Sequence, residues 1–463
     1  MALVLIQDLS FSYPGAAGPV FDGLSLSLDT RWRLGLAGAN GRGKSTLLRL
    51  LAGALAPTAG HIAMPCTAVL FPFCVPDGEM CAYEAAEHLF PETEGWALAR
   101  EAGLLGVAEE ALGRPLATLS GGEATKVLLA MLFAGEERFL LLDEPTNHLD
   151  EPAREAVAAY LARKRGFVVA SHDRALLNAC TTHTLCLEAS GPHLIAGNWA
   201  VYRGETDKRL AFEQAQNDKL RREAKRLDEA AQRAARFAQK AEGEKKGQRN
   251  SGLRPDRGYL GHKAAKMMKR AKSIEARRAQ AAEAQRGLLA DSDAAEALKL
   301  SPLACPQPCA ARFDGARVFY DSVQVCGPVS FAVPAGGRVA LCGPNGCGKT
   351  SLLHAVLPQK PAGLRIEGGV WLAGGTRLSY VPQTAAGVHG TPQAFARACG
   401  LEESRFLAIL RKFGFSRAQF ALPLEQASEG QKKKALLAKS LCESAHLYVW
   451  DEPLNYLDIP ARE

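Results

Sequence analysis

The sequence lacks any apolar run long enough to cross a membrane. None of its 463 residues falls in a stretch that approaches 18 uninterrupted apolar side chains, so we expect no membrane span. The N-terminal residues MALVLIQDLSFSYPG contain neither a basic region nor a cleavage site of the kind found in signal peptides. Their alternation of apolar and polar side chains predicts a strand instead.

The cysteines lack the spacing of a zinc site. All twelve are scattered, and the only close pair, Cys305 and Cys309, has no second pair or histidine nearby. We therefore expect free thiols in a reducing cytoplasm.

The net charge of +7 is unevenly placed. Residues 203–290 contain 24 Lys and Arg against 12 Asp and Glu, and the rest of the chain contains 32 against 37. This concentration indicates a polyanionic partner, although a solvated helix face is the alternative interpretation.

The sequence repeats itself. DEPTNHLDEPARE (143–155) returns as DEPLNYLDIPARE (451–463), GANGRGKST (38–46) as GPNGCGKTS (343–351), LSGGEATKVLLA (119–130) as ASEGQKKKALLA (427–438), and LSFSYPG (9–15) as ARVFYDS (316–322). The similar spacing in both halves predicts a duplicated α/β domain with a helical insert between the copies.

Each half contains the pattern GxxxxGK[ST] of a phosphate-binding P-loop. RLGLAG and RVALCG read as strands that enter the loop, and STLLRLLAG and SLLHAVL read as helices that leave it. Backbone amides of the loop surround phosphate oxygens, the lysine reaches the β- and γ-phosphates, and the hydroxyl binds Mg²⁺. The predicted nucleotide-binding residues are Gly38, Ala39, Asn40, Gly41, Arg42, Gly43, Lys44, Ser45 and Thr46 in the first copy and Gly343, Pro344, Asn345, Gly346, Cys347, Gly348, Lys349, Thr350 and Ser351 in the second.

An apolar strand ends in Asp-Glu in both halves, within FLLLDEP and LYVWDEP. Asp143 and Asp451 are placed to hold Mg²⁺ together with Ser45 and Thr350. Glu144 and Glu452 would polarise the attacking water, because phosphoryl transfer depends mainly on positioning and charge neutralisation. An acidic turn after a buried strand is the alternative, and it is weak for two copies that each follow a P-loop.

A third motif places small polar residues before a helix. Ser120, Gly121 and Gly122 precede EATKVLLAMLFA, and Ser428, Gly430 and Gln431 hold similar places in the second half. A serine and bare amides at a helix N-terminus form an anion site, with a plain helix cap as the alternative.

The insert between the halves predicts a hairpin of two long helices. Residues 205–246 repeat Leu220, Leu227, Ala234 and Ala241 every seven residues, as in a coiled coil, and residues 262–288 form a second amphipathic stretch. The tract 247–261 between them is rich in Gly, Pro and Arg and reads as a loop. We expect three domains: 1–202, the basic hairpin 203–300, and 301–463.

Together these motifs resemble the ATP-binding-cassette ATPases, in which two cassettes close head-to-tail and the signature serine-glycine loop of one completes the P-loop site of the other. The resemblance implies two tandem α/β P-loop cassettes joined by the hairpin, with ATP and Mg²⁺ as cofactors and ATP hydrolysis as the reaction. It further implies adenine stacking by Tyr13 and Tyr320, with a core aromatic as the alternative for each. His172 matches the switch histidine, Gln383 the Q-loop glutamine near Mg²⁺, and Asp150 and Asp458 the dimer-interface loop.

DEPTNHLD and the charged insert resemble the ribosome-associated ABC-F subfamily rather than the transporters. Phe73 in place of the first Q-loop glutamine, SEGQKKK, DEPLNYLD and the basic tract GYLGHKAAKMMKRAKSIEARR (258–278) resemble its antibiotic-resistance branch. That branch protects ribosomes from drugs bound at the peptidyl-transferase region. The resemblance implies a cytoplasmic, monomeric protein that contacts ribosomal RNA near the tRNA site.

The RNA-binding side chains this predicts are Arg249, Arg254, Arg257, Lys263, Lys266 and Lys269. Two other functions stay open: a housekeeping ABC-F translation factor, and the ATPase subunit of a membrane transporter. Because His172 follows Asp143 by 29 residues and Glu463 follows Asp451 by 12, we expect a second cassette that is incomplete at its C-terminus. We also expect unequal ATP sites, since Phe73 and Glu429 depart from the family pattern.

Overall fold

The computed structural model describes residues 2–14, 18–135, 138–147, 149–188, 191–246, 298–415 and 418–462. By packing, one unit comprises residues 1–200 with 295–463, and a second comprises residues 201–294. The first unit contains both copies of the repeat, here called the first half (residues 2–196) and the second half (residues 309–462).

The first half alternates strands and helices. Its strands are β1 (Leu3–Phe11), β2 (Phe21–Asp29), β3 (Arg33–Gly38), β4 (Ala59–Ala63), β5 (Ala68–Phe71), β6 (Phe139–Asp143), β7 (Phe167–Ala170), β8 (His183–Glu188) and β9 (Gly191–Ala196). Its helices are α1 (Lys44–Leu51), α2 (Ala82–Leu89), α3 (Gly95–Leu104), α4 (Glu109–Leu112), η1 (Leu116–Thr118), α5 (Gly121–Ala134), α6 (Glu151–Leu161) and α7 (Arg174–Cys180). The expected N-terminal strand, P-loop helix and signature helix are therefore confirmed.

A mainly parallel sheet in the order β5-β6-β7-β3-β8-β9 forms the centre of the first half. All four residues of β7 are buried, as are the first four of β6, which is typical of parallel strands covered on both faces. The smaller antiparallel sheet β2-β1-β4 packs its buried side chains, including Val4, Ile6 and Leu9, into the same core as α1 and β3. This arrangement brings the carboxyl ends of β3 and β6 to one edge, where the P-loop and the Asp-Glu pair begin.

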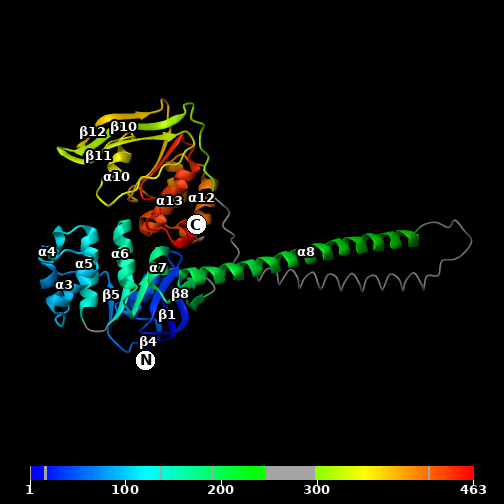
Figure 1. Cartoon of the computed structure of the whole chain (residues 1–463). Helices are drawn as coiled ribbons and strands as arrows, with labels where there is room; N and C mark the ends of the chain where they lie inside the picture. The colour runs from blue at the N-terminus through cyan, green and yellow to red at the C-terminus, as the bar shows by residue number, and fades with distance from the viewer. Residues whose placement is uncertain are drawn as a thin grey trace, which may run out of the picture. The chain divides into compact units, whose positions relative to one another are not determined.

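The second half repeats most of these elements. Its strands are β10 (Cys309–Tyr320), β11 (Val323–Pro334), β12 (Leu364–Leu372), β13 (Leu378–Val381) and β14 (Leu447–Trp450). Its helices are α10 (Lys349–His354), α11 (Pro392–Ala398), α12 (Glu403–Lys412), η2 (Ala418–Ala421), η3 (Leu424–Gln426), α13 (Glu429–Cys442) and α14 (Ile459–Arg462). Figure 1 shows β10, β11 and β12 together as one sheet, which has the order β11-β10-β12 and corresponds to β2-β1-β4.

One expected strand is not found. Residues 338–343, RVALCG, belong to no sheet, and Val339 is 45% exposed. In the first half the matching strand β3 is hydrogen-bonded by β7 on one side and by β8 on the other. No described segment of the second half occupies those two positions, so β13 and β14 pair only with each other. The strand prediction was wrong here because a parallel strand depends on distant partners, not on its own apolar pattern.

The predicted first helix of the insert is confirmed as α8 (Trp199–Lys246), 48 residues long. It begins before residue 205, the start expected from the sequence, and Figure 1 shows it as one continuous helix. The expected loop 247–261 and second helix 262–288 lie outside the described residues.

Candidate functional site

The first P-loop wraps around the start of α1. Gly43 caps this helix with φ of 88°, and a Cβ there would lie 2.6 Å from Val20 Cγ1, so only glycine fits without strain. Lys44 follows and is 8% exposed, with its Nζ 2.8 Å from the carbonyl oxygen of Gly38. Its pKa is lowered by burial. The loop therefore gathers a buried cation and the open amides of a helix N-terminus at one point.

The second P-loop has the same backbone form. Gly348 caps α10 with φ of 86°, and Lys349 Nζ donates to the carbonyl oxygens of Gly343 at 2.9 Å and Pro344 at 2.8 Å. This loop is more open, because Lys349 is half-buried and residues 343–346 are exposed.

A hydroxyl and a carboxylate meet beside each P-loop. Ser45 lies beside the Asp143 side chain and Thr350 beside that of Asp451, and each hydroxyl lowers the pKa of its carboxyl, against the effect of burial. Burial raises the pKa of both aspartates. Asp451 Oδ2 is buried without a hydrogen-bond partner. These donors fit Mg²⁺, which is typically held by one carboxylate, one hydroxyl and substrate phosphates. The described residues include no cluster of three or more His, Cys, Asp or Glu that could hold a metal alone.

Glu144 lies against His172 in the first half. Its φ is +50°, an uncommon value for a side chain other than glycine. His172 Nε2 is 3.5 Å from Glu144 Oε1, and the His172 amide is 3.4 Å from Oε2. Burial raises the pKa of Glu144 to about 7 and lowers the pKa of His172 to about 3. A carboxylate poised near neutrality suits proton movement at an attacking water.

Glu452 has different neighbours. Its φ is +44°, so the backbone matches that of Glu144. Its Oε2, however, accepts hydrogen bonds from the amide nitrogens of Gln383 at 2.8 Å and Asn455 at 2.6 Å. At the position equivalent to Gln383, Phe73 packs edge-to-face on Phe90 with a centroid distance of 5.5 Å. The two halves thus place different groups around the same acidic residue.

The two signature serines cap their helices. Ser120 Oγ accepts a hydrogen bond from the Glu123 amide at the start of α5, and Ser428 Oγ accepts one from the Gln431 amide at the start of α13. The expected cap geometry is present in both. In the first half both signature glycines leave room, because a Cβ at Gly121 meets nothing within 4 Å and one at Gly122 would lie 3.6 Å from Leu149.

Residues 456–458 and the signature glycine Gly430 of the second half lie against the first P-loop. The Asn40 amide donates to Asp458 Oδ2 at 2.8 Å, and Asn40 Nδ2 donates to the Tyr456 carbonyl oxygen at 2.9 Å. A Cβ on Gly430 would lie 2.5 Å from Asn40 Nδ2. Arg462 also donates to the His172 carbonyl oxygen at 3.0 Å. This juxtaposition agrees with the head-to-tail pairing that the family resemblance implies for the first ATP site. Asp150, the counterpart of Asp458, instead caps α6 through the Ala153 amide.

The two tyrosines differ in setting. Tyr13 is 38% exposed, and its hydroxyl is 3.1 Å from Thr46 Oγ1 at the P-loop. Its ring packs edge-to-face on Phe11 at 4.9 Å. Tyr320 ends β10, where it pairs with Val323 and Leu364.

Two lysines in α13 are buried, which the sequence pattern did not predict. Lys433 is 1% exposed and Lys434 is 5% exposed, although KKK reads as a surface charge run. Lys434 Nζ lies 2.9 Å from Asp458 Oδ2, the oxygen that also binds the first P-loop. The available signal was helical spacing: Lys433 and Lys434 lie four residues before Leu437 and Ala438, on the buried face of the helix.

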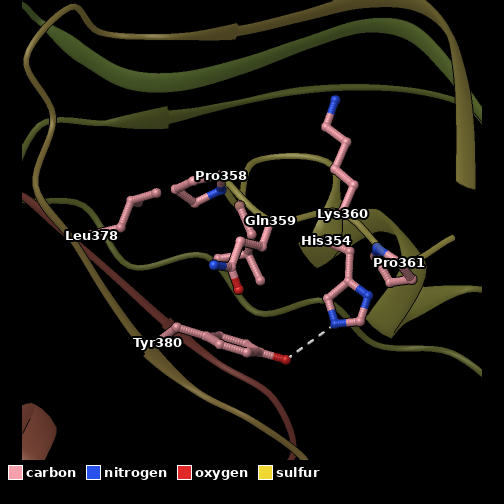
Figure 2. A pocket seen from close by; sticks show the side chains of 8 residues that line it. His354, Pro358, Gln359, Lys360, Pro361, Leu378 and Tyr380 are labelled. Carbon is pink, nitrogen blue, oxygen red and sulfur yellow. Dashed lines mark hydrogen bonds between the residues drawn. The ribbon is translucent and has the colours of Figure 1, made fainter.

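A cavity in the second half lies beside the P-loop helix rather than at the P-loop. It has a volume of about 540 Å³ and is lined by His354, Leu357, Pro358, Gln359, Lys360, Pro361, Leu378 and Tyr380. Figure 2 shows His354 and Tyr380 joined by a hydrogen bond, which is 3.2 Å long. None of the residues predicted to bind nucleotide lines this cavity.

The predicted RNA-binding residues Arg249, Arg254, Arg257, Lys263, Lys266 and Lys269 lie outside the described residues. Among the helices that the structure does describe, none is both long and apolar enough to span a membrane.

A family model described as ABC transporter matches residues 21–147 and 326–455. This chain belongs to the ABC transporter family. Each half is an ATP-binding cassette, and the chain is a dual-cassette ATPase of the ABC-F type.

Several curated proteins are similar over nearly the whole chain. Ribosome protection protein VmlR of Bacillus subtilis is 28% identical over 99% of this chain and 80% of its own length. ATP-binding protein Uup of Caulobacter vibrioides is 30% identical over 96% and 69%. Energy-dependent translational throttle protein EttA of Mycobacterium tuberculosis is 26% identical over 95% and 82%.

A solved structure of the archaeal ribosome recycling factor aABCE1, in complex with the ribosomal stalk protein aP1, has a TM-score of 0.57 to this chain. It covers 98% of this chain and 80% of its own at 18% identity, and thus shares the fold of two tandem cassettes.

Proposed function

We propose that this protein is a cytoplasmic, ATP-dependent ribosome-protection factor that acts against antibiotics of the peptidyl-transferase region. The observation that carries the proposal is the joining of two ATPase cassettes by α8 and the basic tract that follows it. Similarity to VmlR along 99% of the chain supports it. In this account ATP closes the cassettes, the closed form presents the basic segment to ribosomal RNA, and hydrolysis permits release.

The cassettes would use their residues as follows. Lys44 and Lys349 bind phosphate, and Tyr13 and Tyr320 stack on adenine. Ser45 with Asp143, and Thr350 with Asp451 and Gln383, would hold Mg²⁺, which when bound neutralises phosphate charge. Glu144 and Glu452 would orient water, and His172, which lies beside Glu144, would contact the γ-phosphate. Because Asn40 binds Asp458 within one chain, a monomer is sufficient to pair the cassettes.

The test is ribosome pelleting across a salt series. Arg249→Ala, Arg254→Ala and Arg257→Ala together, or Lys263→Ala, Lys266→Ala and Lys269→Ala together, should weaken ribosome binding and lower the log–log salt slope by roughly 2–3. Loss of three phosphate contacts is the physical reason. Drug protection of a sensitive bacterium should be lost, while ATP binding is kept.

A matched control removes three arginines elsewhere. Arg312, Arg365 and Arg397 each form an exposed ion pair in the second half, and replacing them with Ala should leave the slope unchanged. If both basic-tract variants bind ribosomes like the parent at every salt concentration, the tract does not contact RNA and the solvated-face interpretation holds.

Two other functions predict different outcomes. A housekeeping translation factor would bind ribosomes without protecting cells from a drug. A transporter subunit would purify with membranes rather than with ribosomes.

A further inference from the structure

Lys433 occupies an unusual place for a lysine. Its Nζ donates to three backbone carbonyl oxygens: Pro382 at 2.7 Å, Gln383 at 3.2 Å and Asp451 at 3.0 Å. These three acceptors match the three hydrogens of an ammonium group. Burial lowers its pKa, and the charges of Asp451 and Glu452 oppose that shift. A buried cation is costly unless it is fully hydrogen-bonded. Moving any of the three carbonyl oxygens away would leave the Lys433 ammonium partly unpaired, so the lysine restrains the positions of all three.

The three carbonyls belong to the two segments that carry the second ATP site. Pro382 and Gln383 follow β13, and Asp451 follows β14. From these same segments the Gln383 amide reaches the Glu452 carboxylate at 2.8 Å. Lys433 therefore holds the backbones from which both of these side chains project.

The described residues of the first half show no equivalent of this contact. Thr125 occupies the position of Lys433 five residues after its signature serine, and its hydroxyl donates to Gly121 of the same helix at 2.8 Å. Phe73 stands where the Q-loop glutamine would be. The lysine and the glutamine occur together in one half and are both replaced in the other.

We propose that Lys433 is a positioning residue of the second ATP site, which sets the separation of Gln383 and Glu452 and ties both to the signature helix α13. The inference rests on the proposed roles of Gln383 and Glu452 in ATP hydrolysis and is independent of ribosome binding. Lys433 does not touch substrate in this account, and it acts through the two backbones that it joins.

The test compares Lys433→Met with its parent in a ribosome-free ATPase assay, both in a Glu144→Gln background so that turnover reports the second ATP site. Misplacement of catalytic groups by a fraction of an ångström lowers turnover, so kcat should fall on the order of ten- to a hundredfold. The KM for ATP should stay within about threefold, because Lys349 and the P-loop still bind phosphate. Hydrogen exchange of the nucleotide-free chain should be faster in peptides that cover residues 382–386 and 451–456.

A double-mutant cycle separates positioning from a structural role. Because Lys433 acts through the backbones of both Gln383 and Glu452, the kcat losses of Lys433→Met and Gln383→Ala should be clearly less than additive. Lys433→Arg, which keeps charge and donors, should recover part of the activity, and it replaces Lys433→Met in the cycle if that variant fails to fold. Lys439→Met is the control, because Lys439 lies in the same helix and pairs with Glu443 on a half-exposed surface.

The outcomes are distinct. Parent-like kcat and exchange in Lys433→Met, or full additivity with Gln383→Ala, would overturn the proposal. Unchanged turnover in Glu452→Gln would instead refute the catalytic assignment on which it rests. If the parent chain fails to bind ribosomes while the effects of Lys433→Met and Gln383→Ala on kcat remain non-additive, only the proposed cellular role is contradicted.

Discussion

Replacing Glu144 with glutamine should change how the stability of the nucleotide-free chain depends on pH. The folded state raises the pKa of this carboxyl to about 7 from its ordinary value of 4.5, mainly through burial. The folded state therefore binds the proton more tightly than the unfolded state. The resulting stability is fully present below about pH 4.5 and is lost as pH rises to about 7 and beyond.

The size of this effect follows from the shift. About 1.4 kcal/mol per pKa unit gives about 3 kcal/mol between acidic and alkaline conditions. Glu144→Gln has no charge to bury and escapes the cost. The variant should therefore be more stable than the parent at pH 8 by about 3 kcal/mol, on the order of 5–10 °C in Tm for a domain of this size, and close to the parent at pH 5.

Thermal unfolding of Glu144→Gln and the parent at pH 5 and pH 8, without nucleotide, measures this difference in stability. His172, whose pKa is lowered to about 3 by burial, makes the chain less stable as pH falls from about 6.5. Since it is present in both proteins, its effect cancels in the comparison. Glu452→Gln is the matched control, because Glu452 accepts two amide hydrogen bonds. Equal pH dependence in Glu144→Gln and the parent, or a less stable variant at pH 8, would refute the account of this buried carboxyl.

Two further substitutions test the contact between the cassettes. Gly430→Ala would place a Cβ 2.4 Å from the Tyr456 carbonyl oxygen and 2.5 Å from the side-chain amide of Asn40 in the first P-loop. This overpacking costs about 1–3 kcal/mol and should lower ATPase turnover roughly tenfold or more. The control Gly103→Ala, whose Cβ would meet nothing within 4 Å, should not change turnover. Lys434→Met leaves the 2%-exposed Asp458 carboxylate without its cation and should lower the free energy of unfolding by about 3–5 kcal/mol in a urea titration. Lys432→Met, which removes a partly exposed pair, should cost about 1 kcal/mol or less. Equal losses in the two lysine variants would contradict the assigned burial.

The sequence predicted those parts of the fold that local patterns determine. The apolar run before Asp143 forms the buried strand β6, and Ser120 caps α5, the helix that its motif predicts. These features depend on residues a few positions apart, so spacing alone reveals them.

Features that depend on distant partners were not predictable in the same way. Residues 338–343 have the pattern of a strand but no described neighbours to pair with. Lys433 and Lys434 look like surface charge, and only tertiary packing shows that carbonyls and Asp458 surround them. The hydrogen bond between Asn40 and Asp458 joins residues 418 positions apart, and only the family resemblance pointed to it.

The most direct test of the central claim is ribosome pelleting of the chain that carries both Glu144→Gln and Glu452→Gln. These changes keep the phosphate and Mg²⁺ ligands but remove the carboxylates that orient water, so ATP should stay bound and the cassettes closed. With ATP, the double variant should pellet with ribosomes, and with ADP it should remain in the supernatant. Equal pelleting with ATP and ADP, or none with either, would contradict ATP-driven ribosome association.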